Sequence, residues 1–158
     1  MRPGLSEGYQ KRYHPPMRYL LDTNVIVAAL RSHTGASNAL LRLALQGRLP
    51  LVLHHKLVYE YRDVLGRPAC LADTSVTLAD AEILLAHLQA LADEIEVRYL
   101  WRPNLRDEGD NFIVEIAMAA WPCTIVTHNM ADFARAELRF PQIAICTPGQ
   151  LMQSFRCH

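Results

Sequence analysis

The sequence lacks several patterns that would point directly to a function. Its seven glycines form neither a GxGxxG fingerprint nor a P-loop, which disfavours a nucleotide-binding domain. No CxxC pair occurs among its four cysteines, Cys70, Cys123, Cys146 and Cys157. A chain of 158 residues does not need a disulfide framework. A reducing, cytoplasmic compartment is therefore expected.

The sequence also lacks long apolar runs and an excess of charge. No run approaches membrane-spanning length, so we expect no membrane contact. Lys plus Arg and Asp plus Glu both number 16, and this balance neither supports nor excludes a nucleic-acid partner. Residues 1–16 have no signal-peptide core and are rich in Gly, Pro, Tyr, Lys and Arg, so we expect a mobile N-terminal extension. Residues 17–158 are then one domain with a full core.

The chain does contain an alternation of short apolar runs and helical patterns. The apolar runs predict strands at 17–21, 50–53, 96–100, 124–127 and 143–145. Helical spacing and capping residues predict helices at 24–30, 37–47, 55–65, 78–95, 110–120 and 148–155. The face of the fourth helix is predicted to bury Leu84, Leu88, Leu91 and Ile95. This order predicts an α/β fold, a doubly wound parallel sheet between two layers of helices.

The stretch Met17–Leu30 contains the first candidate site residue. Asp22 directly follows a predicted buried strand and directly precedes a predicted helix. Ligands of open α/β sheets bind at the carboxyl ends of the strands. An aspartate there can also serve only as the N-cap of the helix, and this junction alone leaves both interpretations open.

Further acids occupy comparable places. Glu60 lies on the apolar stripe of its helix, where a carboxylate needs a partner unless it reaches water at the edge of the stripe. Asp110 begins a strongly apolar helix, and the acids just before it exceed what one cap requires. Asn129 and Asp132 follow the buried strand 124–127. If the acids converge, they need a cation, and all-oxygen ligands favour Mg²⁺ or Mn²⁺ and phosphoryl chemistry.

These residues resemble a known family. The segments MRYLLDTNVIVAAL, DNFIVEIAMAA and IVTHNMADF, together with Glu60, resemble the motifs of PIN-domain nucleases, and most closely those of VapC-type toxins. The likeness covers most of the chain from Met17 to about Met152. It implies a parallel sheet of about five strands in the order 3-2-1-4-5. It also implies a metal-dependent endoribonuclease acting on single-stranded RNA, a protein antitoxin as partner, and a homodimer.

The resemblance also implies roles for individual residues. Four acids would form the catalytic site with Mg²⁺ or Mn²⁺: Asp22, Glu60, Asp110 and Asp132. Of these, Asp22, Asp110 and Asp132 would bind the metal directly. Four neighbours would support them: Thr23, Asn24, Thr127 and Asn129. Many relatives carry an acid where Asn129 stands here, so the fourth position stays open between Asn129 and Asp132.

Two alternative functions can be weighed on the sequence. A PIN-like domain that has lost catalysis could serve as an adaptor for RNA or protein, although the retention of four acids argues against it. A phosphatase of the haloacid-dehalogenase type also begins with an aspartate at a strand end. That chemistry requires a second aspartate two residues later, where this chain has Asn24.

Overall fold

A computed structural model describes residues 16–97 and 108–157, without the side chains of 108–111 and 135–139. The predicted N-terminal extension thus lies outside the described residues, apart from Pro16. Strands and helices alternate as an α/β fold requires. In chain order the elements are β1 (Arg18–Leu21), α1 (Thr23–Arg31), α2 (Ala36–Leu45), β2 (Val52–Leu53), α3 (His55–Leu65), α4 (Leu78–Leu91), β3 (Asp93–Glu94), α5 (Glu108–Ala119), β4 (Cys123–Val126), α6 (Met130–Arg139), β5 (Ala144–Cys146) and α7 (Pro148–Arg156).

The strands form two parallel sheets rather than one. β1, β4 and β5 make a sheet in the order β1-β4-β5, and β2 pairs with β3. A single parallel bridge between Tyr19 and Leu51 links the two sheets. The expected continuous sheet in the order 3-2-1-4-5 is therefore interrupted between β2 and β1. Pro50, which has no N–H to donate, precedes a strand of only two residues, so the ladder cannot extend there.

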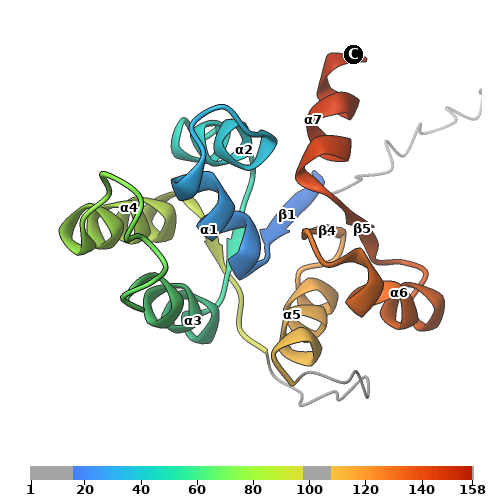
Figure 1. Ribbon diagram of the computed structural model, residues 1–158. Helices are drawn as coiled ribbons and strands as arrows, with labels where there is room; N and C mark the ends of the chain where they lie inside the picture. The colour runs from blue at the N-terminus through green and yellow to red at the C-terminus, as the bar shows by residue number, and fades with distance from the viewer. Residues whose placement is uncertain (1–15, 98–107, 158) are drawn as a thin grey trace, which may run out of the picture.

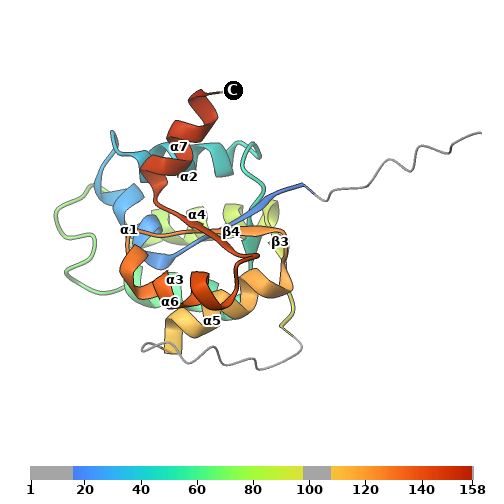
Figure 2. The same cartoon turned by 90° about the vertical axis from the view of Figure 1, so that its right-hand side faces the viewer.

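Helices cover both faces of the β1-β4-β5 sheet. Figure 2 shows α2 and α7 on one face and α5 and α6 on the other. The strand β4 lies between two neighbours, and all four of its residues are buried. A strand that is buried on both faces has a nearly continuous apolar sequence, and for this reason the position of β4 could be predicted.

Two predicted details were wrong, and both concern α4 and the strand after it. The helix predicted at 78–95 ends at Leu91, so Ile95 lies beyond it. Of the predicted buried face, Leu88 is buried, Leu84 and Ile95 are half-buried against the core, and Leu91 is exposed, while Ala81 and Leu85 complete the buried set of α4. The strand predicted at 96–100 lies earlier, at Asp93–Glu94, and the last three residues of that prediction fall outside the described part. Both residues of β3 are polar and exposed, so no apolar run marks them. Pairing with β2 selects them instead, since Asp93 and Ile95 donate their amide protons to Leu51 and Leu53.

The helix α6 was not predicted, because its sequence MADFARAELR is interrupted by four charged residues and has no apolar run. Among its described side chains, only Phe133 is deeply buried. The capping box that the sequence Thr147–Gln150 predicts at the start of α7 is present. At α4 the predicted cap Thr77 is confirmed, and Asp80 completes a capping box there that was not predicted. No helix in the described ranges is long and apolar enough to span a membrane. Figure 1 shows the amino end of α1 at the centre of the molecule, near the carboxyl ends of β1 and β4.

Candidate functional site

The ends of two neighbouring strands bring Asp22 and Thr127 together. The parallel register pairs Leu21 of β1 with Val126 of β4, so the residues that follow each strand also lie side by side. The Asp22 amide donates to the carbonyl of Val126 at 2.9 Å. The Thr127 hydroxyl donates to Oδ2 of Asp22 at 2.7 Å.

Thr127 is the centre of a hydrogen-bond network. Its Oγ1 also accepts from Nδ2 of Asn24 at 3.2 Å and from the amide of Asn129 at 3.0 Å. A hydroxyl has one proton and two lone pairs, so this one is fully used. Asn24 donates as well to Oδ2 of Asp22 at 3.1 Å and accepts from the amide of His128 at 3.1 Å. The network fixes the Asp22 carboxylate against the end of β4.

Asp22 is also the N-cap of α1. Its Oδ1 accepts from the amide of Thr23 at 2.8 Å, and its backbone is extended, as a cap requires. The capping interpretation and the site interpretation are therefore compatible. The cap uses Oδ1, while the network with Thr127 and Asn24 uses Oδ2. Asp22 is only 7% exposed, so these contacts hold a nearly buried carboxylate in one orientation.

An open cleft passes over Asp22 between α1 and α3. Its volume is about 680 Å³, and five of the predicted site residues line it: Asp22, Thr23, Asn24, Glu60 and Asn129. The other lining residues are Val27, Ala28, Arg31, Ser32, Val64 and Arg67. Glu60 is half-buried, so it lies at the edge of its apolar stripe and faces the cleft.

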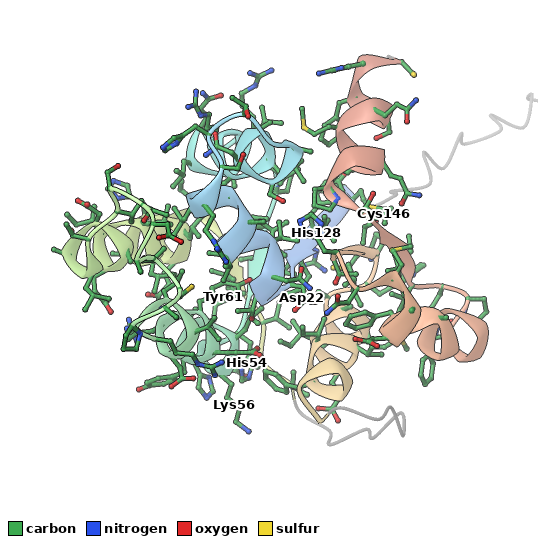
Figure 3. All side chains as sticks on the ribbon, in the orientation of Figure 1. Asp22, His54, Lys56, Tyr61, His128 and Cys146 are labelled. Atoms are coloured by element: carbon green, nitrogen blue, oxygen red, sulfur yellow. The ribbon has the colours of Figure 1, made fainter. Side chains whose placement is uncertain are left out.

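Tyr61 is a residue of this site that the sequence did not single out. It is buried, and its hydroxyl donates to the carbonyl of Leu21, which ties α3 to the end of β1 (Figure 3). Burial raises the pKa of Tyr61 well above its usual value, and the charges of Asp22 and Glu60 raise the pKa further. The phenol therefore stays protonated and keeps its donor role. The sequence places Tyr61 in the apolar stripe of its helix, and that pattern does not indicate a hydrogen bond from its hydroxyl to Leu21.

The structure brings together Asp22, Glu60 and Asn129, but it does not do so for all the predicted acids. Asp110 is the third residue of α5, at the amino end as predicted, and its side chain is outside the described set. Asp132 is exposed in the first turn of α6 and is not among the described residues that line the cleft. Its amide donates to the carbonyl of Asn129 at 3.2 Å.

The donor atoms in the cleft suit a hard cation. Asp22, Glu60 and Asn129 offer carboxylate and amide oxygens, the ligands that Mg²⁺ and Mn²⁺ prefer. Thr23 Oγ1 is buried, lies in the cleft lining, and has no hydrogen-bond partner within the described part of the chain. Among the described side chains, a set that omits Asp110, no three His, Cys, Asp or Glu residues form a metal cage.

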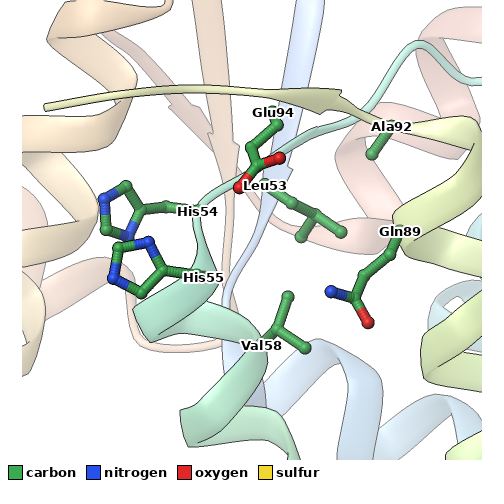
Figure 4. Close-up of a pocket in the computed structure, with 7 residues that line it drawn as sticks. All are labelled: Leu53, His54, His55, Val58, Gln89, Ala92 and Glu94. Carbon is green, nitrogen blue, oxygen red and sulfur yellow. The ribbon is translucent and has the colours of Figure 1, made fainter.

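A second polar cluster lies at the amino end of α3. His54 is its N-cap, and Nδ1 of that ring accepts from the amide of Lys56 at 3.1 Å. The ring also packs on His55 and against the edge of Phe112, with centroids 4.1 Å and 4.9 Å away. Figure 4 shows the two histidines beside a small pocket that also has Glu94 in its lining. Burial, followed by the charges of His55 and Lys56, lowers the pKa of His54.

The chain matches a family of known domains. The model of the family described as the PIN domain matches residues 18–131. Among solved structures, the chain is similar to VapBC2 from Rickettsia felis. The crystal structure of VapBC2 shows it bound to a DNA fragment from the VapBC2 promoter. That likeness has a TM-score of 0.54 and 16% identity, and it covers 84% of this chain and 98% of the other. At this identity it concerns the fold alone. No protein of curated function matches the chain.

Proposed function

The chain belongs to the PIN domain family, and from this premise we propose that it is a metal-dependent endoribonuclease that cleaves single-stranded RNA. The proposed catalytic acids are Asp22, Glu60, Asp110 and Asp132, with Mg²⁺ or Mn²⁺ as cofactor. Asp22, Asp110 and Asp132 would bind the cation. Thr23, Asn24, Thr127 and Asn129 would support them.

One observation carries this proposal. Asp22 follows β1 and Glu60 lies on α3, yet both acids line the same open cleft. Two carboxylates that face the same cleft repel each other, and a cation between or beside them relieves that repulsion. Thr23 Oγ1 adds a buried oxygen without a partner among the described residues at the same place. The carboxylate and hydroxyl oxygens gathered there are the ligand type that a divalent cation prefers.

The residues have separable roles in this proposal. Asp22 would hold the cation with the carboxylate that Thr127 and Asn24 orient. Glu60, which faces the cleft from α3, would orient and deprotonate the attacking water. A bound divalent cation supplies Lewis acidity toward water and the phosphodiester. The cleft is open, so a flexible single strand can reach the acids without a conformational change of the protein.

The proposed biological role is that of a toxin in a toxin–antitoxin module. It rests on the resemblance of the sequence motifs to VapC-type toxins. The similar fold of VapBC2 is consistent with it. An antitoxin protein is the expected partner, a homodimer the expected assembly, and the cytoplasm the expected location. Induced expression should arrest growth for the wild type and leave it unaffected for Asp22→Asn at equal protein levels.

The first prediction concerns the three acids Asp22, Glu60 and Asp110. Replacing any of them with its amide should lower cleavage of single-stranded RNA in Mn²⁺ by more than about a hundredfold. That exceeds the loss of about 10-fold to 100-fold that follows removal of a group that only supports a metal ligand. Rates would be measured on a labelled oligonucleotide, with folding checked by circular dichroism.

Asp73→Asn is the matched control, because Asp73 is an exposed acid that does not belong to the described cleft lining. It should cleave at the wild-type rate. If Asp22→Asn also cleaves at that rate, Asp22 is a cap and the proposed metal site is wrong. RNA binding by a wild type that never cleaves would support the adaptor function instead.

The second prediction ranks the two candidates for the fourth position. Asp132→Asn should lower the rate more than Asn129→Ala, because only a carboxylate contributes charge to the cation. Asn129 would act by orienting groups through hydrogen bonds. The opposite ranking would agree with Asn129 lining the cleft and would assign the fourth position to it.

A further inference from the structure

Two helix faces line the cleft with the same order of chemistry. On α1 the lining residues are Asn24, Val27, Ala28 and Arg31, at the spacing of one helical face. On α3 they are Glu60 and Val64, again on one face, and Arg67 lines the cleft just beyond the helix, which ends at Leu65. Each of these two rows of lining residues begins with a polar or acidic residue beside the proposed metal site. Each continues with small or branched apolar residues and ends with an arginine.

The arginine end lies well away from the acids. Asp22 caps α1 and Arg31 is its last residue, so their Cα atoms are separated by about 13 Å at 1.5 Å per residue. The two ends of this face are therefore placed for different phosphates of one strand. A nucleic-acid strand, in contrast, presents a charge at every backbone phosphate and an apolar base between one charge and the next.

The two arginines differ in their present partners. Arg67 pairs with Asp63 at 2.9 Å, and both side chains are largely exposed. Arg31 is exposed and takes part in none of the ion pairs found among the described residues. A basic residue in the last turn stabilises a helix through its dipole, whichever way the side chain points. Arg31 has this role in α1 and Arg42 has it in α2, but of these two only Arg31 also lines the cleft.

We propose that Arg31, with Arg67 beside it, binds a backbone phosphate of the substrate strand that is not the phosphate being cleaved. Val27, Ala28 and Val64 would contact the nucleoside portion between the two phosphates. This inference rests on the proposed function and deepens it, because it makes the substrate a polynucleotide that extends along the cleft. It also explains how a neutral chain with an acidic site would retain a polyanion.

The test is a binding measurement that does not depend on cleavage. Fluorescein-labelled single-stranded RNA would be titrated with Glu60→Gln protein, in Mn²⁺ and at several salt concentrations. Adding Arg31→Ala should weaken binding by about tenfold, the effect of losing one charge-assisted hydrogen bond. The slope of log affinity against log salt should also fall by about 0.7, the value for one phosphate contact on a single strand.

Arg42→Ala in the same background is the matched control, because Arg42 is exposed and in the last turn of its helix but outside the described cleft lining. It should leave affinity and slope unchanged, and Arg31→Lys should recover most of the loss. Equal affinities for Arg31→Ala and its parent, or an equal loss for Arg42→Ala, would overturn the inference. If Arg31 proves necessary for binding but the wild type does not cleave RNA, the catalytic proposal fails and this contact stands.

Discussion

At the scale of single residues, one hydroxyl decides the geometry of the site. Thr127 Oγ1 is fully buried and makes three hydrogen bonds, to Asp22, Asn24 and Asn129. The first two partners are more than 100 residues away in sequence. Removing the hydroxyl would take one hydrogen-bond partner from the buried Asp22 carboxylate, from the half-buried Asn24 amide and from the backbone N–H of the exposed Asn129. At a buried group, the loss of a partner costs more than the bond contributes.

Thr127→Val should therefore destabilise the protein by about 2 kcal/mol, since taking a partner from a buried polar group such as the Asp22 carboxylate costs about 1 to 3 kcal/mol. Urea unfolding would measure the change, and Thr127→Ser should recover most of it. Thr124→Val is a control on β4, the strand that Thr127 follows, because among the described residues the Thr124 hydroxyl is bonded only to the sulfur of Met17. A similar loss at both positions would mean that the network adds nothing beyond the packing of a threonine.

At the scale of elements, α3 is held at both ends of the stretch that contains Glu60. His54 caps its first turn, and Tyr61 ties its middle to the end of β1. The cap requires a neutral ring, because Nδ1 must accept the amide proton of Lys56. Protonation of His54 would thus weaken the element that positions Glu60.

The pH dependence follows from the lowered pKa of His54. Below the usual histidine pKa, about 6.5, the unfolded chain binds a proton that the folded chain resists. The stability contribution of His54 is therefore present above about pH 6.5 and is lost as the pH falls toward the lower pKa of the folded state. Protein with His54→Asn keeps a capping side chain but has no titrating ring. Its melting temperature should fall less than that of wild type between about pH 7.5 and pH 5.5.

His33→Asn is the control for this measurement, because His33 is exposed in the turn after α1. It should show the full wild-type drop in melting temperature. If His54→Asn shows the same drop as wild type, the acid sensitivity of the fold does not come from the α3 cap.

At the scale of the whole molecule, the site joins two parts of an interrupted sheet. Asp22 and Thr127 follow strands of the β1-β4-β5 sheet, whereas Glu60 lies on the helix that follows β2. A single bridge, between Tyr19 and Leu51, links the two sheets. A cation held by residues from both parts would add a connection where the backbone ladder provides little.

Mn²⁺ should consequently raise the melting temperature. A ligand at about 100 times its Kd adds about 2.7 kcal/mol by mass action, which corresponds to roughly 5 to 10 °C for a chain of this size. The shift between EDTA and Mn²⁺ should be much smaller in Asp22→Asn and in Glu60→Gln, and unchanged in Asp73→Asn. An undiminished shift in Asp22→Asn would place the stabilising cation elsewhere in the molecule.

The sequence by itself determined the features that depend on residues close together in the chain. The cap that the Asp22 carboxylate gives to α1 and the side-chain caps that begin α4 and α7 all use bonds across at most three residues. The strand before Asp22 is marked by its own short apolar run, although its hydrogen bonds go to distant segments. Helix α3 was predicted with the bounds that it has, because its apolar stripe and the glycine after it are local signals.

The tertiary structure alone decided the features that depend on pairing between distant segments. The position of β3 follows from pairing with β2, and the break in the sheet follows from Pro50 and two very short strands. No local pattern indicates that Glu60 and Asn129 line one cleft, or that the Tyr61 hydroxyl reaches Leu21. Residues far apart in the chain meet only when whole elements pack, and that packing is a collective result of the core rather than of any segment.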